Sequence, residues 1–227
     1  MNLLAIDTAT EVCMIGVQAG ERCLGRSERA GRAQTERILP MIDALCGEAG
    51  IALRELDALV MGRGPGAFTG LRVTAGVVQG LAFALDIPVV PVSSLLILAC
   101  TAARVHERER VIAAFDARMD EVYWCAAKRQ GDVMLIQGSE RLTAPEQVGA
   151  GLTGDWLGVG PAWAAYGPRM AAEASCRIMQ GDGELMAAGE DALRLGAQAL
   201  AAGQAVRAEQ AVPLYLRNEV AWRKSTT

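Results

Sequence analysis

Residues 62–72 read GRGPGAFTGLR, a glycine-rich turn between an apolar strand pattern and a long apolar helix pattern. Such a turn can bring bare backbone N–H groups against a phosphate at the positive end of a helix dipole. The Gly-Lys-Ser/Thr ending of the common phosphate loop is missing, because the stretch ends in Thr69-Gly70-Leu71-Arg72. Two interpretations stay open. The turn is a phosphate cradle with Arg63 or Arg72 as counter-charge, or, as we favour, a tight turn packed against a neighbouring segment.

Apolar patterns on both sides of this turn predict alternating strands and helices. After Thr35 the apolar positions recur every three or four residues, which indicates an amphipathic helix with Thr35 as N-cap, a bend at Pro40 and Gly50 just past its end. In the first half we expect strands at 2–7, 12–18, 24–29, 58–61 and 88–92, and helices at 35–49, 68–85 and 94–103. In the second half we expect strands at 111–116, 121–128, 133–137 and 157–160, and a helix at 192–202.

The chain divides into two halves, each of which begins with a strand ending in an aspartate, Asp7 or Asp116. This order resembles the duplicated, two-subdomain α/β fold of the actin, sugar-kinase and heat-shock chaperone superfamily. The resemblance implies that such aspartates hold Mg²⁺ and nucleotide phosphates across a cleft. A charged segment at 104–110 sets the expected boundary, with an N-terminal α/β subdomain at 1–105 and a C-terminal one at 106–227, whose helix near 190–203 packs back on the first.

Five sequence blocks carry a more specific resemblance. With GRGPGAFTGLR they are LLAIDTAT at 3–10, LAFALDIPVVPVSSL at 81–95, FDARMDEVYW at 115–124 and VPLYLRNEVAW at 212–222. In this order, and spanning nearly the whole chain, they resemble the bacterial TsaB family, also called YeaZ. That resemblance implies a supporting role in making N6-threonylcarbamoyladenosine on tRNA, with TsaD as the catalytic partner.

Composition limits the kinds of partner. The 227 residues are 52% hydrophobic and carry a formal net charge of -4, which argues against a protein that grips nucleic acid by itself. We therefore expect contact with tRNA to be indirect. The N-terminus has no basic lead-in and no apolar run approaches the ~18 residues of a membrane-spanning helix, so we expect a cytoplasmic protein that does not contact a membrane.

Cysteine and histidine usage argues against metal and nucleophilic chemistry. The six cysteines form no CxxC pair, and we interpret them as reduced core thiols. His106 is the only histidine, so one chain cannot build a two-histidine metal site, and its charged neighbours predict an exposed position. Where the metal motif of TsaD-type relatives would fall, the chain reads Ala33-Gln34-Thr35-Glu36-Arg37 without a histidine. We expect no catalytic residue and no metal ligand.

Polar residues at two strand ends leave alternatives open. Asp7, Thr8 and Thr10 offer hard oxygen ligands for a metal-phosphate, or they form a simple Asx or Ser/Thr turn. The polar residues at 116–123 are compatible with acid-base work, but we favour a structural ion-pair network. A vestigial nucleotide site would comprise Asp7, Thr8, Gly64, Gly66 and Asp116.

Small residues point to a helix surface. Gly76, Gly80 and Ala84 are four apart and share one face of the 68–85 helix, which indicates an interface or a tight internal contact. The apolar stripe of the preceding helix is either core or a patch for a partner. The TsaB resemblance implies that both helices serve self-pairing and TsaD binding. The candidate interface residues are Ile38, Leu39, Ile42, Leu45, Phe68, Arg72, Gly76, Gly80 and Ala84.

The sequence thus favours a non-catalytic scaffold or activator subunit. It would be a homodimer alone, would pair with a TsaD-like transferase, and by family resemblance would also meet a TsaE-like ATPase. It would need no cofactor of its own, with ATP and Mg²⁺ confined to the partner complex. The alternative is a nucleotide-dependent ATPase or kinase-like enzyme that holds Mg-ATP with Asp7, Gly64, Gly66 and Asp116, or a residual glycoprotease-like peptidase.

Overall fold

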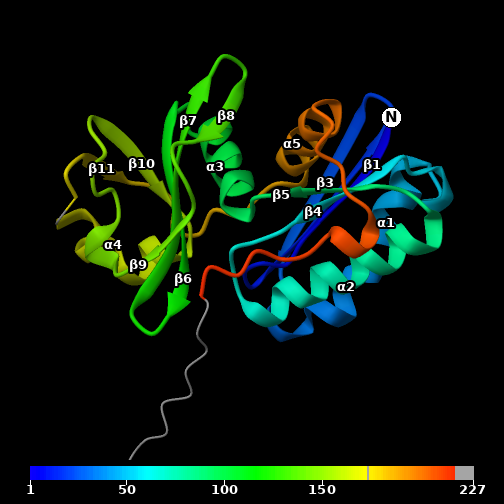
Figure 1. Cartoon of the computed structure of the whole chain (residues 1–227), viewed down its shortest axis with the longest axis horizontal. Coiled ribbons are helices and arrows are strands. Elements are labelled where there is room, and N and C mark those ends of the chain that lie inside the picture. The colour runs from blue at the N-terminus through cyan, green and yellow to red at the C-terminus, as the bar shows by residue number, and fades with distance from the viewer. Residues whose placement is uncertain (173, 218–227) are drawn as a thin grey trace, which may run out of the picture.

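The computed structural model describes residues 1–172 and 174–217, so the end of the VPLYLRNEVAW block, at 218–222, lies outside the described residues. A first sheet has the strand order β3-β2-β1-β4-β5 (Figure 1). Its first three strands form an antiparallel meander, and the last two run parallel to β1. The strands are β1 Asn2–Asp7, β2 Val12–Ala19, β3 Arg22–Arg29, β4 Ala58–Gly62 and β5 Val89–Val92.

The second sheet repeats this plan. Its order is β11-β10-β6-β7-β8, with β9 also paired to β7. The central β6 and β7 are antiparallel, whereas β10 and β11 run parallel to β6. The strands are β6 Arg110–Arg118, β7 Glu121–Gln130, β8 Val133–Ile136, β9 Arg141–Thr143, β10 Asp155–Val159 and β11 Arg177–Gln180. The predicted duplicated α/β fold is confirmed.

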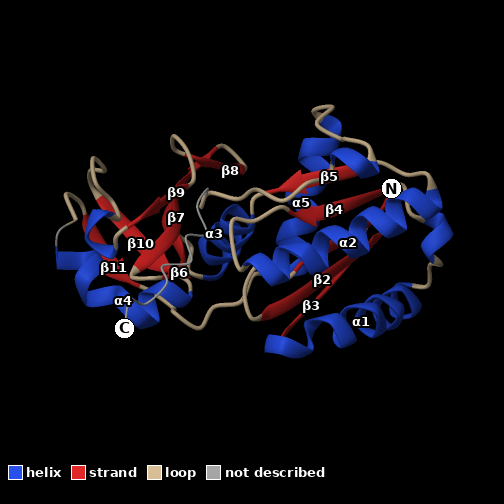
Figure 2. Cartoon of the chain, turned by 60° about the horizontal axis from the view of Figure 1, so that its bottom comes forward, coloured by secondary structure: helices blue, strands red, loops and turns tan. Residues whose placement is uncertain are grey.

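Helices cover both sheets. On one face of the first sheet lie α1 and α2, side by side, and α5 covers the other face (Figures 1 and 2). On the second sheet lie α3 and α4. The helices are α1 Gln34–Ala49, α2 Phe68–Leu85, α3 Ser94–Val105, α4 Pro161–Ala172 and α5 Gly189–Ala201, with single 3-10 turns at Gly31–Ala33, Leu53–Glu55, Pro145–Gln147 and Ala208–Gln210. We call each sheet with its helices a lobe.

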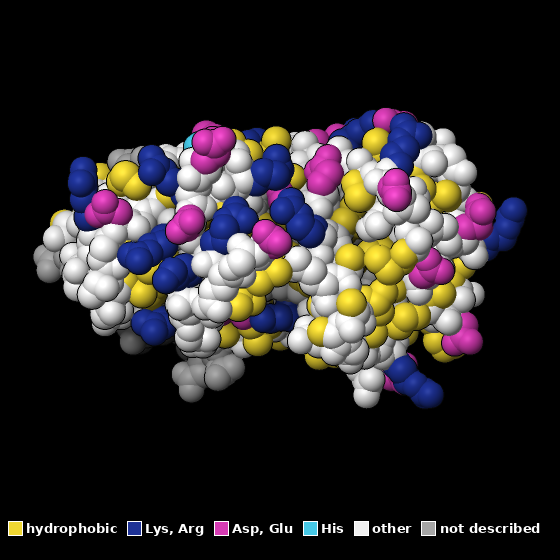
Figure 3. Space-filling model, turned by 90° about the horizontal axis from the view of Figure 1, so that it is seen from above, with side chains coloured by type: hydrophobic (Ala, Val, Ile, Leu, Met, Phe, Trp, Pro, Cys, Tyr) yellow, Lys and Arg dark blue, Asp and Glu magenta, His cyan; other side chains and the backbone are white. Residues whose placement is uncertain are grey.

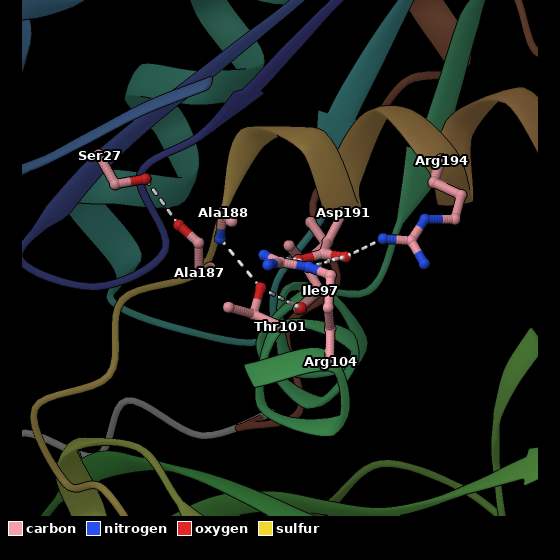
Figure 4. Close-up of polar contacts among 8 residues, drawn as sticks. All are labelled: Ser27, Ile97, Thr101, Arg104, Ala187, Ala188, Asp191 and Arg194. Atoms are coloured by element: carbon pink, nitrogen blue, oxygen red, sulfur yellow. Dashed lines mark hydrogen bonds and ion pairs between the residues drawn. The ribbon is translucent and has the colours of Figure 1, made fainter. Parts of the chain in front are cut away.

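Two helices are exchanged between the lobes. The helix that follows the first sheet, α3, packs on the second sheet, and α5, which follows the second sheet, packs on the first. They meet where Arg104 of α3 binds the buried Asp191 carboxylate at 2.8 Å and Thr101 accepts a hydrogen bond from the Ala188 N–H at 3.0 Å (Figure 4). The boundary expected at residue 105 does not follow this packing, because it assigns α3 to the N-terminal half.

The start of α1 also differs from the prediction. The helix begins at Gln34, its N-cap is Ala33 without a side-chain hydrogen bond, and Thr35 lies exposed inside the first turn. Gln34 instead donates from Nε2 to the carbonyl oxygens of Thr10, at 2.6 Å, and Val12, at 3.2 Å. These bonds fix the helix start to the β1–β2 turn, which explains why a buried amide replaces a capping hydroxyl.

Candidate functional site between the two lobes

The glycine-rich turn after β4 is shaped by contact with the β1–β2 turn. A β-carbon added at Gly62 would overlap the carboxyl group of Asp7, and one added at Gly66 would overlap the carbonyl oxygen of Ala9. The Ala67 N–H donates to the same Ala9 carbonyl at 2.7 Å. These glycines are needed because only a residue without a β-carbon allows the two turns to approach so closely. Packing against a neighbour, the favoured interpretation, is confirmed.

The two arginines of this turn are engaged within the chain. Arg63 donates from Nη2 to Glu140 of the second lobe at 2.8 Å, and the Glu140 side chain is almost fully buried. The guanidinium of Arg72 lies 3.9 Å from the centre of the Phe68 ring. Arg63 therefore ties the lobes together, and both arginines, which the sequence left open as phosphate counter-charges, make contacts within the chain.

Asp7 ends β1 and lines a cleft between the lobes. The residue is 6% exposed, and its Oδ1 accepts a hydrogen bond from the Ala9 N–H at 2.6 Å. Burial raises the pKa of the Asp7 carboxyl above its usual range, while hydrogen bonds from Ser94 and Ala9 lower this pKa in part. The bond to Ala9 is the Asx turn that the sequence offered as an alternative to a metal ligand.

Asp116 lines the same cleft from the end of β6 in the second lobe. Its Oδ1 accepts a hydrogen bond from the Arg118 N–H at 2.7 Å, and its Oδ2 pairs with the Arg118 guanidinium at 3.0 Å. Each cleft aspartate is thus engaged by its own turn. Carboxylates from both lobes facing one cleft are what a nucleotide site of this fold would require.

Two members of the predicted nucleotide site do not line the cleft. The fully buried Thr8 donates its hydroxyl to the Gly70 carbonyl at 2.7 Å and its N–H to the Thr74 hydroxyl of α2 at 2.9 Å. Gly64, at φ 91°, donates its N–H to the Ser94 hydroxyl at 3.1 Å. The predicted group of five therefore reduces, at the cleft, to Asp7, Gly66 and Asp116.

The cleft itself measures about 1130 Å³, slightly more than the usual volume of a ligand site. Its walls come from the β1–β2 turn, the starts of α1 and α2, the β6–β7 turn, and two segments that cross between the lobes at 183–187 and 214–217. Charges of both signs line it: Arg29, Arg32, Arg118 and Arg217, with Asp7, Glu11 and Asp116. Sequence reasoning missed the two crossing segments, which have no apolar period.

The polar residues at 116–123 form ion pairs, as we favoured. Arg169 of α4 binds Asp120, at 2.9 Å between Nη2 and Oδ2, and Glu146 at 2.6 Å. Arg217 binds Glu121 at 2.7 Å. Pairing with Arg169 lowers the pKa of the Asp120 carboxyl. In the described part of the chain, no group of three or more His, Cys, Asp or Glu residues is arranged to hold a metal ion.

The thiols and the histidine differ in part from expectation. Cys13, Cys46 and Cys125 are buried, but Cys23 is exposed and the other two are half-buried. Burial raises the pKa of Cys13 to about 11 and that of Cys100 to about 12. His106 caps the C-terminus of α3 and is half-buried, with Nε2 inside and without a partner among the described residues, so the prediction of an exposed histidine is wrong.

A second feature of the first lobe is the uncovered face of α2. Gly76 and Gly80 are exposed, and a β-carbon added at either would meet nothing within 4 Å. Phe83 is 83% exposed and Phe68 is 50% exposed. The internal-contact alternative for the glycine face is therefore wrong, and the face is open. The sequence analysis missed Phe83, although it lies three residues after Gly80 on the same side of the helix.

The stripe on α1 divides differently from the prediction. Ile38, Ile42 and Leu45 are buried in the core beneath α1 and α2, so they cannot contact a partner. Leu39 is 56% exposed. Of the candidate interface residues, those that are exposed are Leu39, Phe68, Arg72, Gly76, Gly80 and Ala84.

The apolar excess of α2 is unusual for a surface helix. Its 18 residues have a mean hydropathy of 1.4, so by length and composition alone the helix could span a membrane. We had expected no apolar run of this length. Its inner face packs in the first-lobe core through Leu71, Ala75, Val78 and Ala82. Other apolar residues, such as Phe83, lie on the open face.

Comparison with known proteins agrees with this architecture. A family model described as "TsaD: tRNA N6-adenosine threonylcarbamoyltransferase" matches residues 27–160. The tRNA threonylcarbamoyladenosine biosynthesis protein TsaB of Escherichia coli is 40% identical over 99% of this chain and 98% of its own length. The structure of YeaZ from Pseudomonas aeruginosa superimposes with a TM-score of 0.88 at 47% identity, covering 95% of this chain and 99% of that one. A second Pseudomonas aeruginosa structure, described as having similarity to peptidase YeaZ, gives a TM-score of 0.83 at 45% identity, covering 95% and 99%. The chain belongs to the TsaB family, within the wider family that the TsaD model describes.

Proposed function

We propose that the chain is a non-catalytic subunit that pairs with a TsaD-like transferase through the open face of α2. Membership of the TsaB family gives it a role in tRNA threonylcarbamoyladenosine biosynthesis. In the proposed complex, the partner transfers the threonylcarbamoyl group to the adenosine beside the tRNA anticodon, and this chain supports the partner's active conformation. The main observation behind this proposal is the open face of α2, where Gly76 and Gly80 leave room for a partner to approach closely beside the exposed Phe83.

The chemistry of the cleft favours a non-catalytic role for this chain. Asp7 is held by Ala9 and Ser94, and Asp116 is held by Arg118, so each carboxylate already has a structural task. The raised pKa of Cys13 and of Cys100 keeps both thiols protonated at neutral pH, and a protonated thiol is a poor nucleophile.

The charge distribution supports indirect contact with tRNA. Phosphate recognition needs clustered Lys and Arg side chains, and the chain has a formal net charge of -4. On the face seen in Figure 3, dark-blue basic side chains spread over both lobes and alternate with magenta acidic ones. We propose that the TsaD-like partner supplies the tRNA contact, and that a TsaE-like ATPase joins the complex.

The open face of α2 also fits a second copy of the chain. A two-fold axis places the same patch on both subunits, so glycines near the axis would let the two copies of α2 approach closely. We propose that the free chain is a homodimer through this face and that the TsaD-like partner replaces the second copy.

The test is the mass of the protein by size-exclusion chromatography with light scattering, alone and mixed with a TsaD-like transferase. We expect a dimer alone and a mixed complex after addition. Gly76→Leu and Gly80→Leu should weaken both species because leucine fills the space needed for close approach. Ala201→Leu, on an exposed position of α5 at the opposite face of the sheet, is the matched control and should associate normally.

Two outcomes would contradict the proposal. If both leucine variants on α2 pair as the unmodified protein does, the choice of face is wrong. If tRNA is modified at full rate in a reconstituted system that lacks only this chain, the supporting role is wrong.

The second candidate function is a nucleotide-dependent enzyme, favoured by the cleft that Asp7, Gly66 and Asp116 line together. Thermal unfolding with millimolar ATP and Mg²⁺ tests it, because a ligand at 100 times its Kd stabilises a protein by ~2.7 kcal/mol. Asp116→Asn should abolish the shift if the site holds Mg-ATP. An unchanged melting temperature would remove this candidate.

A further inference from the structure

The chain after α5 returns along the first lobe before it crosses to the second. Val206 pairs with Val89 of β5 through two backbone hydrogen bonds of 2.9 and 2.8 Å. Gln79 of α2 donates from Nε2 to the Ala211 carbonyl at 3.0 Å. We call residues 206–217 the strap. Its orange-to-red ribbon in Figure 1 runs from α5 past α2 to the lower end of β6.

The far end of the strap holds the β6–β7 turn of the second lobe. Arg217 donates from Nη2 to the Ala117 carbonyl at 3.1 Å and binds Glu121 at 2.7 Å. The three residues at the tip of this turn, Arg118, Met119 and Asp120, have φ angles of 61°, 54° and 61°. Residues other than glycine rarely adopt this left-handed backbone conformation, so contacts from outside the turn are needed to hold it. Arg217 of the strap supplies such contacts.

Just before Arg217, the strap also contacts the first lobe beside the proposed partner surface. Leu214 donates its N–H to the Arg63 carbonyl at 2.7 Å. The ring of Tyr215 lies 5.5 Å from that of Phe68, the first residue of α2. Arg72 stacks on the same Phe68 ring. A partner that covers this end of α2 would therefore press on the residue that anchors the strap.

A short segment joins the two anchors of the strap. Leu214 and Arg217 are three residues apart, and an extended chain spans at most ~3.6 Å per residue. A movement of the second lobe beyond this reach must therefore break the bonds of Arg217 or pull Tyr215 from Phe68. Leu214, Tyr215 and Arg217 also line the cleft, so this movement would open its wall.

We propose that the strap is a mechanical tie that couples the open face of α2 to the β6–β7 turn, so that occupation of that face and closure of the cleft depend on each other. The tie acts in the free chain, and its link to partner binding rests on the proposed function. Arg63 strengthens it, because its carbonyl anchors the strap while its guanidinium grips Glu140 of the second lobe.

Hydrogen exchange of the backbone amides at 117–121, measured in the free full-length chain, tests the tie. Arg217→Gln should speed exchange there about tenfold, the effect expected when charge-assisted hydrogen bonds are lost. Tyr215→Ala should speed it as well, although Tyr215 donates no hydrogen bond to this turn. In the double variant, exchange at 117–121 should be only slightly faster than in the faster single variant, because both changes break the same tie.

The control is Arg54→Gln, which removes the same charge from an exposed residue that makes no side-chain hydrogen bond or ion pair in the described part of the chain. It should leave exchange at 117–121 unchanged. Retention of the far-ultraviolet circular dichroism spectrum would show that the variants fold. If Tyr215→Ala leaves exchange at 117–121 unchanged in a folded protein, the tie is overturned.

A second exchange experiment adds a TsaD-like transferase. We expect protection on α2 together with slower exchange at 117–121, and in Arg217→Gln we expect the α2 protection without the change at 117–121. Protection of α2 alone in the unmodified chain overturns the coupling and leaves the partner proposal intact. Absence of protection on α2 overturns the partner proposal, while the result in the free chain still decides the tie.

Discussion

Two neighbouring helices of the first lobe each carry a row of apolar or small residues, but one row is buried and the other is exposed. Ile38, Ile42 and Leu45 of α1 face the sheet and are buried, whereas Gly76, Gly80 and Phe83 of α2 face outward with nothing over them. Both helices lie on the same face of the sheet (Figure 2). A periodic apolar pattern therefore shows which side of a helix avoids water, but the pattern alone does not tell whether the chain itself or another molecule covers that side.

The charged residues explain why the two rows were hard to separate. The outer side of α1 is marked by charges, including Glu36, Arg37 and Glu48, so its inner side follows by elimination. In α2 the only charged residue is Arg72, and both sides are apolar or small. Once Leu71, Ala75, Val78 and Ala82 are seen in the core, the row of glycines must face outward.

The largest expected effect is on the buried row. Ile42→Ala should lower the free energy of unfolding by about 3 kcal/mol, because it removes three carbons from a closely packed core and leaves a cavity. Urea unfolding followed by circular dichroism measures the change. Ala84→Ser, on the open face of α2, is the control and should shift stability by less than about 0.5 kcal/mol. A loss below about 1 kcal/mol for Ile42→Ala would mean that the α1 row is not a rigid core.

The open row should respond in the opposite way. Phe83→Ala should leave unfolding nearly unchanged, because an 83% exposed ring buries little surface within the chain. It should weaken association with a TsaD-like transferase by about 2 kcal/mol, roughly 30-fold in Kd, as loss of an aromatic anchor does. Titration calorimetry gives the Kd. Unchanged affinity would place the partner elsewhere on the lobe.

The first lobe was the easier half to predict from sequence. The predicted helix at 68–85 has the bounds of α2, and β4, the strand before the glycine turn, begins at Ala58 as predicted. In the second half, α4, β9 and β11 were missed. Gly167 and Pro168 interrupt the helical pattern of α4, and β11 is a short edge strand of four residues. The exchange of α3 and α5 is a tertiary feature with no local signal.

The candidate site was predicted in outline only. The superfamily resemblance implied that Asp7 and Asp116 lie across one cleft, and both line it. Thr8 was misplaced because its burial depends on Thr74 of α2, which is distant in sequence. The strap was missed because its segment at 211–217 has no regular secondary structure, so periodicity carries no information there.

The two cleft aspartates allow the same comparison for charged side chains, because Asp7 is buried and Asp116 is only half-buried. Burial raises the pKa of Asp7, so the folded state holds its proton to higher pH than the unfolded chain, whose carboxyl titrates near 3.8. Ionisation of Asp7 therefore lowers the free energy of unfolding progressively as pH rises from the pKa of the unfolded chain through the higher pKa of the folded state. Asp7→Asn should remove this slope and raise the free energy of unfolding at pH 7, because no buried charge then has to be desolvated.

Urea unfolding of Asp7→Asn and the unmodified chain at several values from pH 4 to pH 7 measures the difference. Asp116→Asn is the matched control: Asp116 is only half-buried and faces Arg118, so we expect no such gain at pH 7. A loss of stability in Asp7→Asn at pH 7 would show that the Asp7 charge is favourable in the folded state.

The smallest expected effect decides how far the partner surface extends. Leu39 belongs to α1 but lies on the side away from Arg37, whose guanidinium reaches Glu28 of β3 at 2.6 Å. It is 56% exposed, so Leu39→Ser should change stability by less than about 0.5 kcal/mol. Its Kd for a TsaD-like transferase should rise about threefold, as expected for a residue at the rim of an interface. Ala44→Ser, on the outer side of α1, should not change the Kd. Equal affinity for Leu39→Ser would confine the surface to α2 and make α1 a core helix alone.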